Sequence, residues 1–203
     1  MRKVIVSEFM SLDGVIEDPG GAGELDRGGW SFRSDRGAEG DKFKDDELAA
    51  ADALLLGRIT YEGFAAAWPQ MEEQTGEYGA RMNGYPKYVA SRTLQEPLEW
   101  NNSTLIEGDI ADGVARLKQQ DGKDILIFGS GELARLLMGN DLIDEYRLMV
   151  QPVVVGKGKR LFGDVGEVRD LRLVDTQQVG PDGVLILTYR PVGKEAPITR
   201  PLA

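Results

Sequence analysis

Three short apolar runs of the sequence lead directly into glycine, arginine and hydroxyl residues. Glycine lets the backbone approach phosphate oxygens closely, and arginine can bind a phosphate through two parallel hydrogen bonds. Serine and threonine hydroxyls add further donors to such a site. This residue chemistry is typical of phosphate binding. The three segments are Gly57-Arg58-Ile59-Thr60, Ser91-Arg92 and Gly129-Ser130-Gly131.

The runs before these segments have the pattern of strands buried on both faces, as in parallel sheets. The carboxyl ends of such strands meet at one edge of an open α/β sheet, where ligands bind. Two of the segments open helices, whose N-termini offer unpaired N–H groups and positive potential. Together they predict a site for a diphosphate plus one further phosphate, which is what NADPH presents. Plain turn chemistry for the glycines, and surface salt bridges for Arg58 and Arg92, are the alternatives.

The segment Gly129–Ala134 also matches the dinucleotide-binding pattern G-x-G-x-x-A. A Rossmann domain further requires an acidic residue at the end of the next strand, where it holds the ribose. Here that strand runs to Gln151-Pro152 and ends without an acid. The sequence therefore disfavours a standard Rossmann domain.

Two residue types that are common in catalysis are absent from the 203 residues, because there is no Cys and no His. Their absence excludes disulfides, thiol nucleophiles, Ser-His-Asp triads and metal centres built from His or Cys. Proton transfer must therefore use Asp, Glu, Lys, Tyr or water. A carboxylate site for Mg²⁺ or Ca²⁺ stays possible on composition, but we assign no metal-binding residue.

The balance of charge is acidic, since 24 Lys and Arg face 34 Asp and Glu and give a net charge of −10. This disfavours binding to nucleic acid or to an anionic membrane. No apolar stretch is long enough to span a bilayer, and the start Met1–Val6 lacks the apolar core of a signal peptide. We expect a cytoplasmic protein that acts on a small molecule.

Strand and helix patterns alternate along most of the chain, and the last two strand patterns flank a Gly-Pro-Asp-Gly turn signal. This order predicts an α/β fold with a mostly parallel sheet and an antiparallel C-terminal hairpin. We expect one domain over residues 1–192 and a disordered tail over residues 193–203. The segment from Glu17 to Gly40 is expected to be a long loop that folds over another part of the protein or a ligand. A mobile surface segment without a function is the alternative. Strands are expected at residues 2–10, 53–56, 87–90, 103–106, 124–128, 145–155, 168–179 and 184–190, and helices at 41–51, 59–67, 109–120 and 132–138.

Six segments spread over nearly the whole chain are Ser11–Gly14, Leu55–Glu62, Lys87–Arg92, Ile127–Leu133, Leu142–Arg147 and Pro152–Phe162. In this order they resemble the dihydrofolate-reductase-like family. The similarity is closest to the reductase domain of bacterial riboflavin-biosynthesis deaminase-reductases and their stand-alone relatives. The resemblance implies a three-layer α/β/α fold, NADPH binding and a homodimer. It says less about the substrate, because the stand-alone relatives are diverse.

The same resemblance implies cofactor contacts at three turns. The first turn joins a strand to a helix and meets the phosphates, the second meets the adenosine 2′-phosphate, and the third meets the pyrophosphate again. The matching residues are Gly57, Arg58 and Thr60 for the first, Ser91 and Arg92 for the second, and Gly129, Ser130, Gly131, Glu132 and Leu133 for the third.

Residues beside the substrate are less sharply defined. Asp13 and Gly14 match the family segment next to the nicotinamide and substrate, and we expect Asp13 to supply the acceptor's proton; a simple turn residue is the alternative. Trp30 and Trp68 are expected to stack on an aromatic heterocycle, with core packing as the alternative. In dihydrofolate reductases the acid lies on the helix before the Gly-Arg turn. Here that helix, residues 41–51, offers several carboxylates and no unambiguous choice.

These features predict an NADPH-dependent reductase of a pterin-like or riboflavin-precursor pyrimidine-like heterocycle. Its activity would resemble that of 5-amino-6-(5-phosphoribosylamino)uracil reductase or dihydrofolate reductase. Hydride transfer needs few protein groups, because the cofactor supplies the reactivity. The alternative is a non-catalytic nucleotide- or flavin-binding module on the same fold. Apolar runs from Glu145 onward also predict a homodimer, since exposed sheet edges must be covered or paired.

Overall fold

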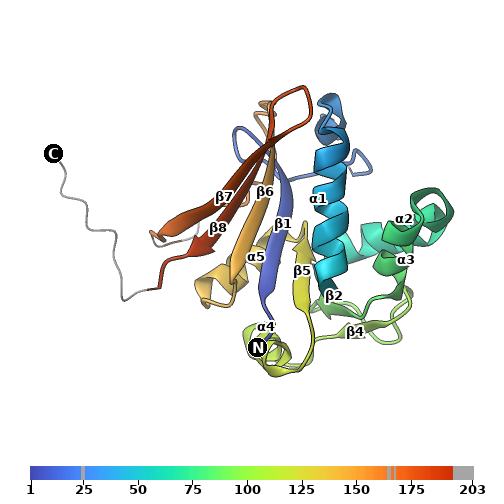
Figure 1. The fold of residues 1–203 in the computed structure, drawn as a ribbon. Coiled ribbons are helices and arrows are strands. Elements are labelled where there is room, and N and C mark those ends of the chain that lie inside the picture. The colour runs from blue at the N-terminus through green and yellow to red at the C-terminus, as the bar shows by residue number, and fades with distance from the viewer. Residues whose placement is uncertain (24–25, 164–165, 167, 194–203) are drawn as a thin grey trace.

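The computed structural model describes residues 1–23, 26–163, 166 and 168–193. Its centre is an eight-stranded sheet with the strand order β4-β3-β2-β5-β1-β6-β8-β7 (Figure 1). The expected disordered tail lies outside the described residues, apart from residue 193. The strands are β1 (Val4–Ser11), β2 (Ala51–Gly57), β3 (Lys87–Ala90), β4 (Ser103–Leu105), β5 (Asp124–Phe128), β6 (Glu145–Gln151), β7 (Leu171–Val179) and β8 (Val184–Pro191). The helices are α1 (Gly37–Ala50), α2 (Arg58–Thr75), α3 (Glu77–Gly84), α4 (Ile110–Gln119), α5 (Gly131–Gly139) and the short 3-10 helix η1 (Trp30–Arg33).

The first six strands in this order, from β4 through β3, β2, β5 and β1 to β6, run parallel to one another. Strand β8 pairs antiparallel with β6, and β7 pairs antiparallel with β8. Successive residues Val4, Ile5 and Val6 of the central strand β1 are all fully buried, as in a strand covered on both faces. The mostly parallel sheet with an antiparallel C-terminal hairpin, which the sequence predicts, is confirmed.

Helices cover both faces of the parallel part of the sheet and make a three-layer molecule (Figure 1). On one face, Val114 of α4 and Leu137 of α5 share a core cluster with Ile127 of β5. On the other face, Leu48 of α1 and Tyr61 of α2 belong to a second cluster. Full burial of such an aliphatic side chain stabilises the fold by about 1.5–3 kcal/mol. The predicted α/β/α layering is therefore also confirmed.

Several expected elements have different bounds in the structure: the strands expected at 2–10, 53–56 and 168–179 are β1, β2 and β7, and the helix expected at 41–51 is α1, which begins four residues earlier. Two further elements differ clearly at their C-terminal ends. The helix expected at residues 59–67 is α2, which continues through Pro69 to Thr75 although proline lacks the N–H of an interior helix residue. The strand expected at residues 145–155 ends at Gln151. The next residue, Pro152, has no N–H to donate to a strand ladder, which explains the earlier end.

The structure also contains elements that the sequence patterns did not predict. Helix α3 follows α2 after the single residue Gly76, whose φ of +57° suits a glycine at this sharp turn. The segment expected to be a loop over residues 17–40 contains η1 and the first turn of α1. Trp30 of η1 is 2 % exposed and packs in a cluster with Val15 and Val155. The loop is thus fastened to the end of the sheet by its tryptophan.

Candidate functional site

The turns after β2 and β5 are joined by hydrogen bonds at the carboxyl edge of the sheet. The Gly57 N–H donates to the Ser130 Oγ at 2.9 Å. The Ser130 N–H in turn donates to the Thr60 Oγ1 at 2.9 Å, and the Ser130 hydroxyl donates to the Phe128 carbonyl at 3.0 Å. Two segments that lie about seventy residues apart in sequence, as the separation of Thr60 and Ser130 shows, therefore form one structure.

The β5 turn requires a glycine for two reasons. Gly129 has a φ of +55°, a left-handed conformation that side chains rarely adopt. A Cβ atom at this position would lie 2.9 Å from the Thr60 Oγ1. Ser130 shares the left-handed conformation, with a φ of +58°. This sharp turn leaves backbone, and no side chain of residue 129, facing the space above the β2 and β5 ends.

Two helices begin at this point and leave toward opposite faces of the sheet. Helix α2 begins after Gly57 and α5 after Ser130, and neither N-terminal residue caps its helix with a side-chain hydrogen bond. Unpaired N–H groups and the helix dipole make such N-termini binding sites for anions. Ligands of open α/β sheets bind in the crevice where neighbouring connections diverge in this way. The donors present here fit a diphosphate.

The turn after β3, with Ser91 and Arg92, lies beside the turn after β2. Gly57 and Ala90 are paired in register in β2 and β3, so Ser91 follows at the same edge of the sheet. The Ser91 Oγ accepts hydrogen bonds from the N–H groups of Thr93 and Leu94 at 3.1 and 3.0 Å. This arrangement orders the turn and leaves Arg92 exposed. The structure therefore brings the three sequence-predicted turns to one edge, in the spatial order β3, β2, β5.

Some predicted cofactor residues are less available than others. Arg58 is half-exposed and forms an ion pair with Glu62, 2.9 Å away on the same helix. Glu132 is an exposed acid in the first turn of α5, where its negative charge opposes an anionic ligand. Leu133 is buried in the cluster of α4 and α5, so only its backbone faces the helix N-terminus. The cofactor roles of all three residues stay predictions.

Asp13 follows β1 and is held by hydrogen bonds. Its carboxylate accepts the N–H of Val155 at 3.0 Å and of Gly156 at 2.9 Å, and the Ser11 hydroxyl at 2.8 Å. Arg160 lies 3.3 Å from the same carboxylate. These bonds, chiefly those from Val155 and Ser11, lower the pKa of Asp13 to about 2. The carboxylate thus fastens the turn after β1 to the segment after β6.

Gly14 takes part in the same turn. Its N–H donates to the Ser11 carbonyl at 2.9 Å, and its φ is +81°. Its carbonyl accepts the N–H of Leu161 at 3.2 Å. Gly14 therefore shapes the connection on which Asp13 lies, and its contact with a substrate stays a prediction.

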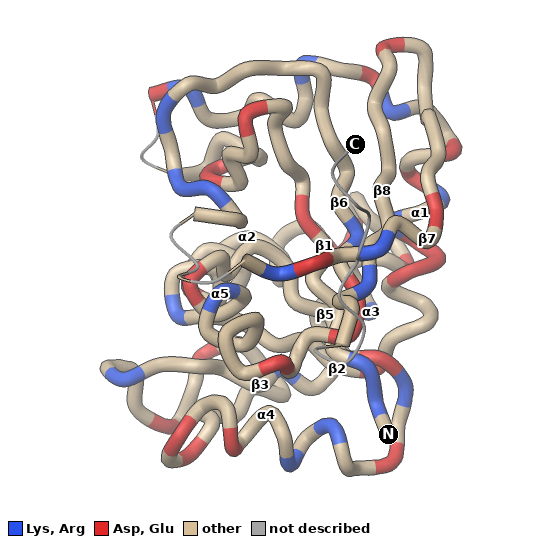
Figure 2. Tube along the Cα trace, turned by 90° about the vertical axis from the view of Figure 1, so that its left-hand side faces the viewer, with Lys and Arg blue, Asp and Glu red and all other residues tan. Residues whose placement is uncertain are grey.

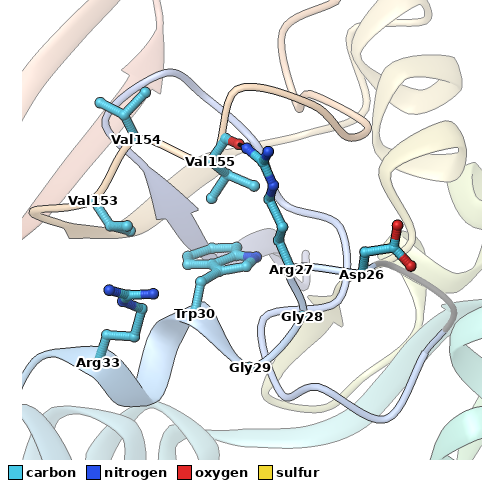
Figure 3. A pocket seen from close by; sticks show the side chains of 9 residues that line it. All are labelled: Asp26, Arg27, Gly28, Gly29, Trp30, Arg33, Val153, Val154 and Val155. Atoms are coloured by element: carbon cyan, nitrogen blue, oxygen red, sulfur yellow. Dashed lines mark hydrogen bonds between the residues drawn. The ribbon is translucent and has the colours of Figure 1, made fainter.

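A pocket of about 500 Å³ opens beside Trp30 (Figure 3). The Trp30 Nε1 donates to the Glu17 carbonyl at 2.8 Å, which fixes the orientation of the indole. Figure 3 shows the guanidinium groups of Arg27 and Arg33 on either side of the indole. The wall of the pocket is mostly polar, with two arginines and an aspartate, and the nearly buried indole and three valines supply its apolar part. The lining residues are Asp26, Arg27, Gly28, Gly29, Trp30, Arg33, Val153, Val154 and Val155.

Trp68 lies elsewhere. Its ring packs edge-on against Phe64 at 6.1 Å and lies 5.6 Å from the ring of Tyr78. It belongs to the cluster of α2 and α3 and does not line the Trp30 pocket. The structure therefore does not bring the two tryptophans to one pocket, and a substrate contact of Trp68 stays a prediction.

Sequence reasoning missed a buried polar cluster between β1 and α1, formed by Ser7, Lys44 and Glu47. The Lys44 Nζ donates to the Ser7 Oγ at 2.8 Å, and the Ser7 hydroxyl donates to the Glu47 Oε1 at 2.7 Å. Lys44 and Glu47 also form an ion pair. The Lys44 ammonium lies over the rings of Phe9 and Phe128, at 5.1 and 4.8 Å. The one sequence signal for this cluster is the polar pair Ser7-Glu8, which interrupts the apolar residues of β1.

Two further polar side chains near this edge are buried and incompletely paired. Glu8 is 3 % exposed, and its Oε1 has no hydrogen-bond partner among the described residues. Burial raises the pKa of Glu8 well above its usual value, although the Lys44 ammonium and the Gly129 N–H act in the opposite direction. Gln151 is fully buried, and both polar atoms of its amide lack a partner within the described part of the chain. Such groups are rare in folded proteins and call for an explanation.

Acidic and basic residues are interspersed along the trace (Figure 2). Because the net charge is −10, attraction of an anion to this edge depends on local groups such as the helix N-termini. Within the described ranges, no set of three or more acidic side chains is arranged to hold a metal ion. Among the same residues, no helix is both long and apolar enough to cross a membrane.

A three-layer α/β/α fold around a mostly parallel sheet, with phosphate-type turns after neighbouring strands, is the architecture of dihydrofolate-reductase-like proteins. The chain belongs to the RibD C-terminal domain family, whose model matches residues 2–185. This places it among reductase-like domains and confirms the resemblance found in the sequence.

Individual relatives agree with this assignment. The chain is 33% identical over 190 residues to the uncharacterized protein YyaP of Bacillus subtilis. The alignment covers 93% of this chain and 94% of YyaP. A solved structure from Shewanella sp. PV-4, provisionally assigned to riboflavin biosynthesis, has a TM-score of 0.71 at 25% identity and covers 94% of this chain and 99% of its own. The deaminase/5-amino-6-(5-phosphoribosylamino)uracil reductase of Thermotoga maritima has a TM-score of 0.63 at 17% identity. That match covers 94% of this chain and 57% of the Thermotoga chain, and it shows the fold alone.

Proposed function

We propose that this protein is an NADPH-dependent reductase that transfers a hydride to a small heterocycle resembling a pterin or a riboflavin-precursor pyrimidine. The observation that carries the proposal is the Ser130–Gly57 hydrogen bond, which joins two helix N-termini over the crevice between β2 and β5. Reductase-like relatives support the same class of reaction.

The residues at this edge fit the parts of NADPH. The N–H groups at the starts of α2 and α5 would hold the diphosphate, with Thr60 and Ser130 fixing the two turns. Ser91 and Arg92, one strand further out, would hold the adenosine 2′-phosphate. NADPH, when bound, supplies the hydride. The protein then has to orient the acceptor and exclude water, for which buried walls such as Trp30 are suited.

The acceptor would occupy the Trp30 pocket and the adjoining end of β1. Asp13, predicted from sequence to supply the proton, has a pKa of about 2 and is a carboxylate at neutral pH. We therefore assign it to positioning the turn, where it orders Val155 and Gly156 behind the pocket. A direct proton-donor role for Asp13 stays a prediction, which the activity of an Asp13→Asn variant would test.

The cofactor assignment is tested by titrating the protein with NADPH and with NADH in a thermal-shift experiment. We expect saturable stabilisation by NADPH. Arg58→Ala, at the turn that would meet the diphosphate, should weaken NADPH and NADH alike. Arg92→Ala should weaken NADPH about tenfold or more and NADH much less, because a charge-assisted hydrogen bond is worth about 1.5–3 kcal/mol. Equal losses for both nucleotides in Arg92→Ala would contradict the 2′-phosphate assignment, and no saturable NADPH binding would contradict the reductase.

One observation favours a second function, a nucleotide- or flavin-binding module without turnover. Asp13 is the acid placed next to the substrate by family resemblance, yet its low pKa leaves it without a proton to give. Steady oxidation of NADPH in the presence of pteridine, pyrimidine or quinone acceptors would exclude this alternative. NADPH binding without oxidation for any acceptor would favour it.

We further propose that the protein forms a homodimer through the C-terminal hairpin. Leu173 and Val174 of the edge strand β7 are 46% and 41% exposed, and Leu185 of β8 is 38% exposed. An edge strand with exposed apolar side chains is a surface for pairing with a second copy. Light scattering should give the mass of two chains; a mass of one chain would contradict the proposal.

A further inference from the structure

Glu8 of β1 lies beside the turn that carries part of the proposed diphosphate site. Ser7 is paired in register with Phe128, the last residue of β5, so Glu8 comes next to Gly129 at the start of that turn. The Gly129 N–H acts to lower the pKa of the Glu8 carboxyl, as a donor close to that group does. A change in the charge of Glu8 therefore takes place at the base of the β5 turn.

The side chain of Glu8 lies on the face of the sheet that α5 covers. Side chains alternate along a strand, and Ser7 faces α1, where its hydroxyl donates to Glu47. Glu8 therefore points to the opposite face, as does its register partner Leu148. Leu148 packs there in the cluster that includes Leu133 of α5. The carboxyl group is thus placed beneath the N-terminus of α5, which forms one half of the proposed diphosphate site.

The surroundings of Glu8 favour its neutral form. The side chain is 3% exposed, and its Oε1 has no hydrogen-bond partner among the described residues. Burial raises the pKa of Glu8 well above its usual value; the Lys44 ammonium lowers it, but that ammonium is ion-paired with Glu47, which itself raises the pKa. Other charged side chains on β6, on α5 and on the loops beyond β1 are not among the causes of this shift. They are Glu145, Arg147, Glu132, Arg135, Asp13 and Arg160.

A diphosphate and an ionised Glu8 compete for the same positive potential. The N–H groups at the start of α5 attract an anion, and the helix dipole adds to that attraction. A carboxylate beneath them cancels part of the attraction, whereas a neutral carboxylic acid leaves it intact. We propose that Glu8 is a proton-controlled switch of nucleotide binding, which favours NADPH when it is protonated and opposes NADPH when it is ionised. This inference rests on the proposed function and names the regulation of that site.

The coupling acts through charge and does not require Glu8 to contact the nucleotide. Because NADPH binds better to the protein with protonated Glu8, NADPH binding must in turn favour protonation of Glu8, by the reciprocity of linked equilibria. NADPH binding therefore takes up a proton from the solvent at a pH where Glu8 is partly ionised in the free protein. Couplings between two sites are typically about 5–150-fold, and we expect about tenfold here.

The inference is tested by measuring the NADPH dissociation constants of wild type and Glu8→Gln between about pH 6 and pH 9. Glutamine has nearly the same size and no charge at any pH, and titration of the NADPH phosphates is common to both proteins. The two constants should agree within about twofold at pH 6, and that of wild type should be about tenfold higher at pH 9. Glu73→Gln, an exposed acid on α2, is the matched control and should follow wild type. A ratio that stays constant over this range would overturn the inference.

Calorimetry on wild type keeps the test independent of how well Glu8→Gln folds. NADPH binding is measured at about pH 8, where the 2′-phosphate has already lost its second proton. Two buffers with different enthalpies of ionisation are compared, because protons exchanged on binding change the observed heat. A difference that corresponds to proton uptake supports the inference, and no exchange or a release of protons would overturn it.

The same titrations separate this inference from the proposed function. Saturable NADPH binding with the same pH dependence in wild type and Glu8→Gln would overturn only the inference. Absence of saturable NADPH binding in wild type at every pH would overturn the proposed function, and the inference with it.

Discussion

Ser130 binds Gly57 across the gap between two strand ends, because its Oγ accepts the Gly57 N–H at 2.9 Å. This bond fixes the distance between the N-termini of α5 and α2. A diphosphate that spans both N-termini, as we propose for NADPH, needs that distance to be constant, so the hydroxyl would preorganise the proposed site before the ligand binds.

Replacing Ser130 with Ala should therefore weaken both NADPH binding and the fold. The variant loses two neutral hydrogen bonds, one from the Gly57 N–H and one to the Phe128 carbonyl, and each contributes about 0.5–1.5 kcal/mol to the free energy of unfolding. NADPH affinity should fall about tenfold, because the two turns are no longer joined. Denaturant unfolding and nucleotide titration measure the two quantities. Thr104→Ala on β4, an exposed hydroxyl far from the turns in strand order, is the control; a similar loss of affinity there would contradict the argument.

Strands whose sequence is bounded by turn residues were predicted closely. Lys87–Ala90 and Asp124–Phe128 have the expected bounds, because a buried parallel strand is a continuous apolar run with a sharp end. The phosphate-type turns were visible for the same reason. Glycine and hydroxyl residues directly after such a run indicate a sharp turn at the strand end, and their contacts with a ligand stay predictions.

The buried polar groups could not be predicted in this way. Ser7 and Lys44 are 37 positions apart, and their contact depends on how α1 lies across the sheet. The burial of the Gln151 amide depends on tertiary packing around its position opposite Ser11 at the end of β6. Tertiary packing determines such contacts, and local periodicity carries no information about them.

The Asp13 carboxylate should make stability depend on pH in the acid range. Its pKa in the folded protein, about 2, lies below the usual 3.8, so its contribution is complete above pH 3.8 and is lost as the pH falls through about 2. Asp13→Asn should be less stable than wild type by about 1 kcal/mol at pH 7, which is less than the usual value of about 1.5–3 kcal/mol for a charged hydrogen bond because solvent screens the side chain, which is 21% exposed. Urea unfolding should show this difference shrinking between pH 4 and pH 2. A constant difference over that range would contradict the assignment.

Glu8 should have the opposite effect. Burial raises its pKa in the folded protein above the usual 4.5, so the unfolded state ionises first and stability falls as the pH rises above 4.5. While the folded carboxyl stays neutral, the expected slope is about 1.4 kcal/mol per pH unit. Glu8→Gln should remove this slope and be more stable than wild type at pH 8. Glu73→Gln, an exposed acid on α2, is the control and should leave the slope unchanged.

Removing only one partner of the Lys44–Glu47 ion pair should lower the free energy of unfolding strongly. Both side chains are nearly buried, at 8% and 1% exposure, and the Glu47 Oε2 has no hydrogen-bond partner among the described residues. Lys44→Met leaves the Glu47 carboxylate with only the longer ion pair to Arg147 at 3.8 Å, and should lower the free energy of unfolding by about 3 kcal/mol, the low end for one-sided removal of a buried ion pair. Lys42→Met, on the exposed side of the same helix at 72% exposure, should change it by less than about 0.5 kcal/mol.

The double variant Lys44→Met/Glu47→Leu decides whether the cost comes from the uncompensated charge. With both ions gone, apolar side chains can pack against Phe9 and Phe128, whose rings already contact the lysine head. Replacement of a buried pair by apolar residues is often neutral or stabilising. We therefore expect the double variant to recover most of the stability lost in Lys44→Met. If guanidinium unfolding instead showed the two losses adding, each side chain would stabilise the fold independently, and the cluster would act through packing with its neighbours.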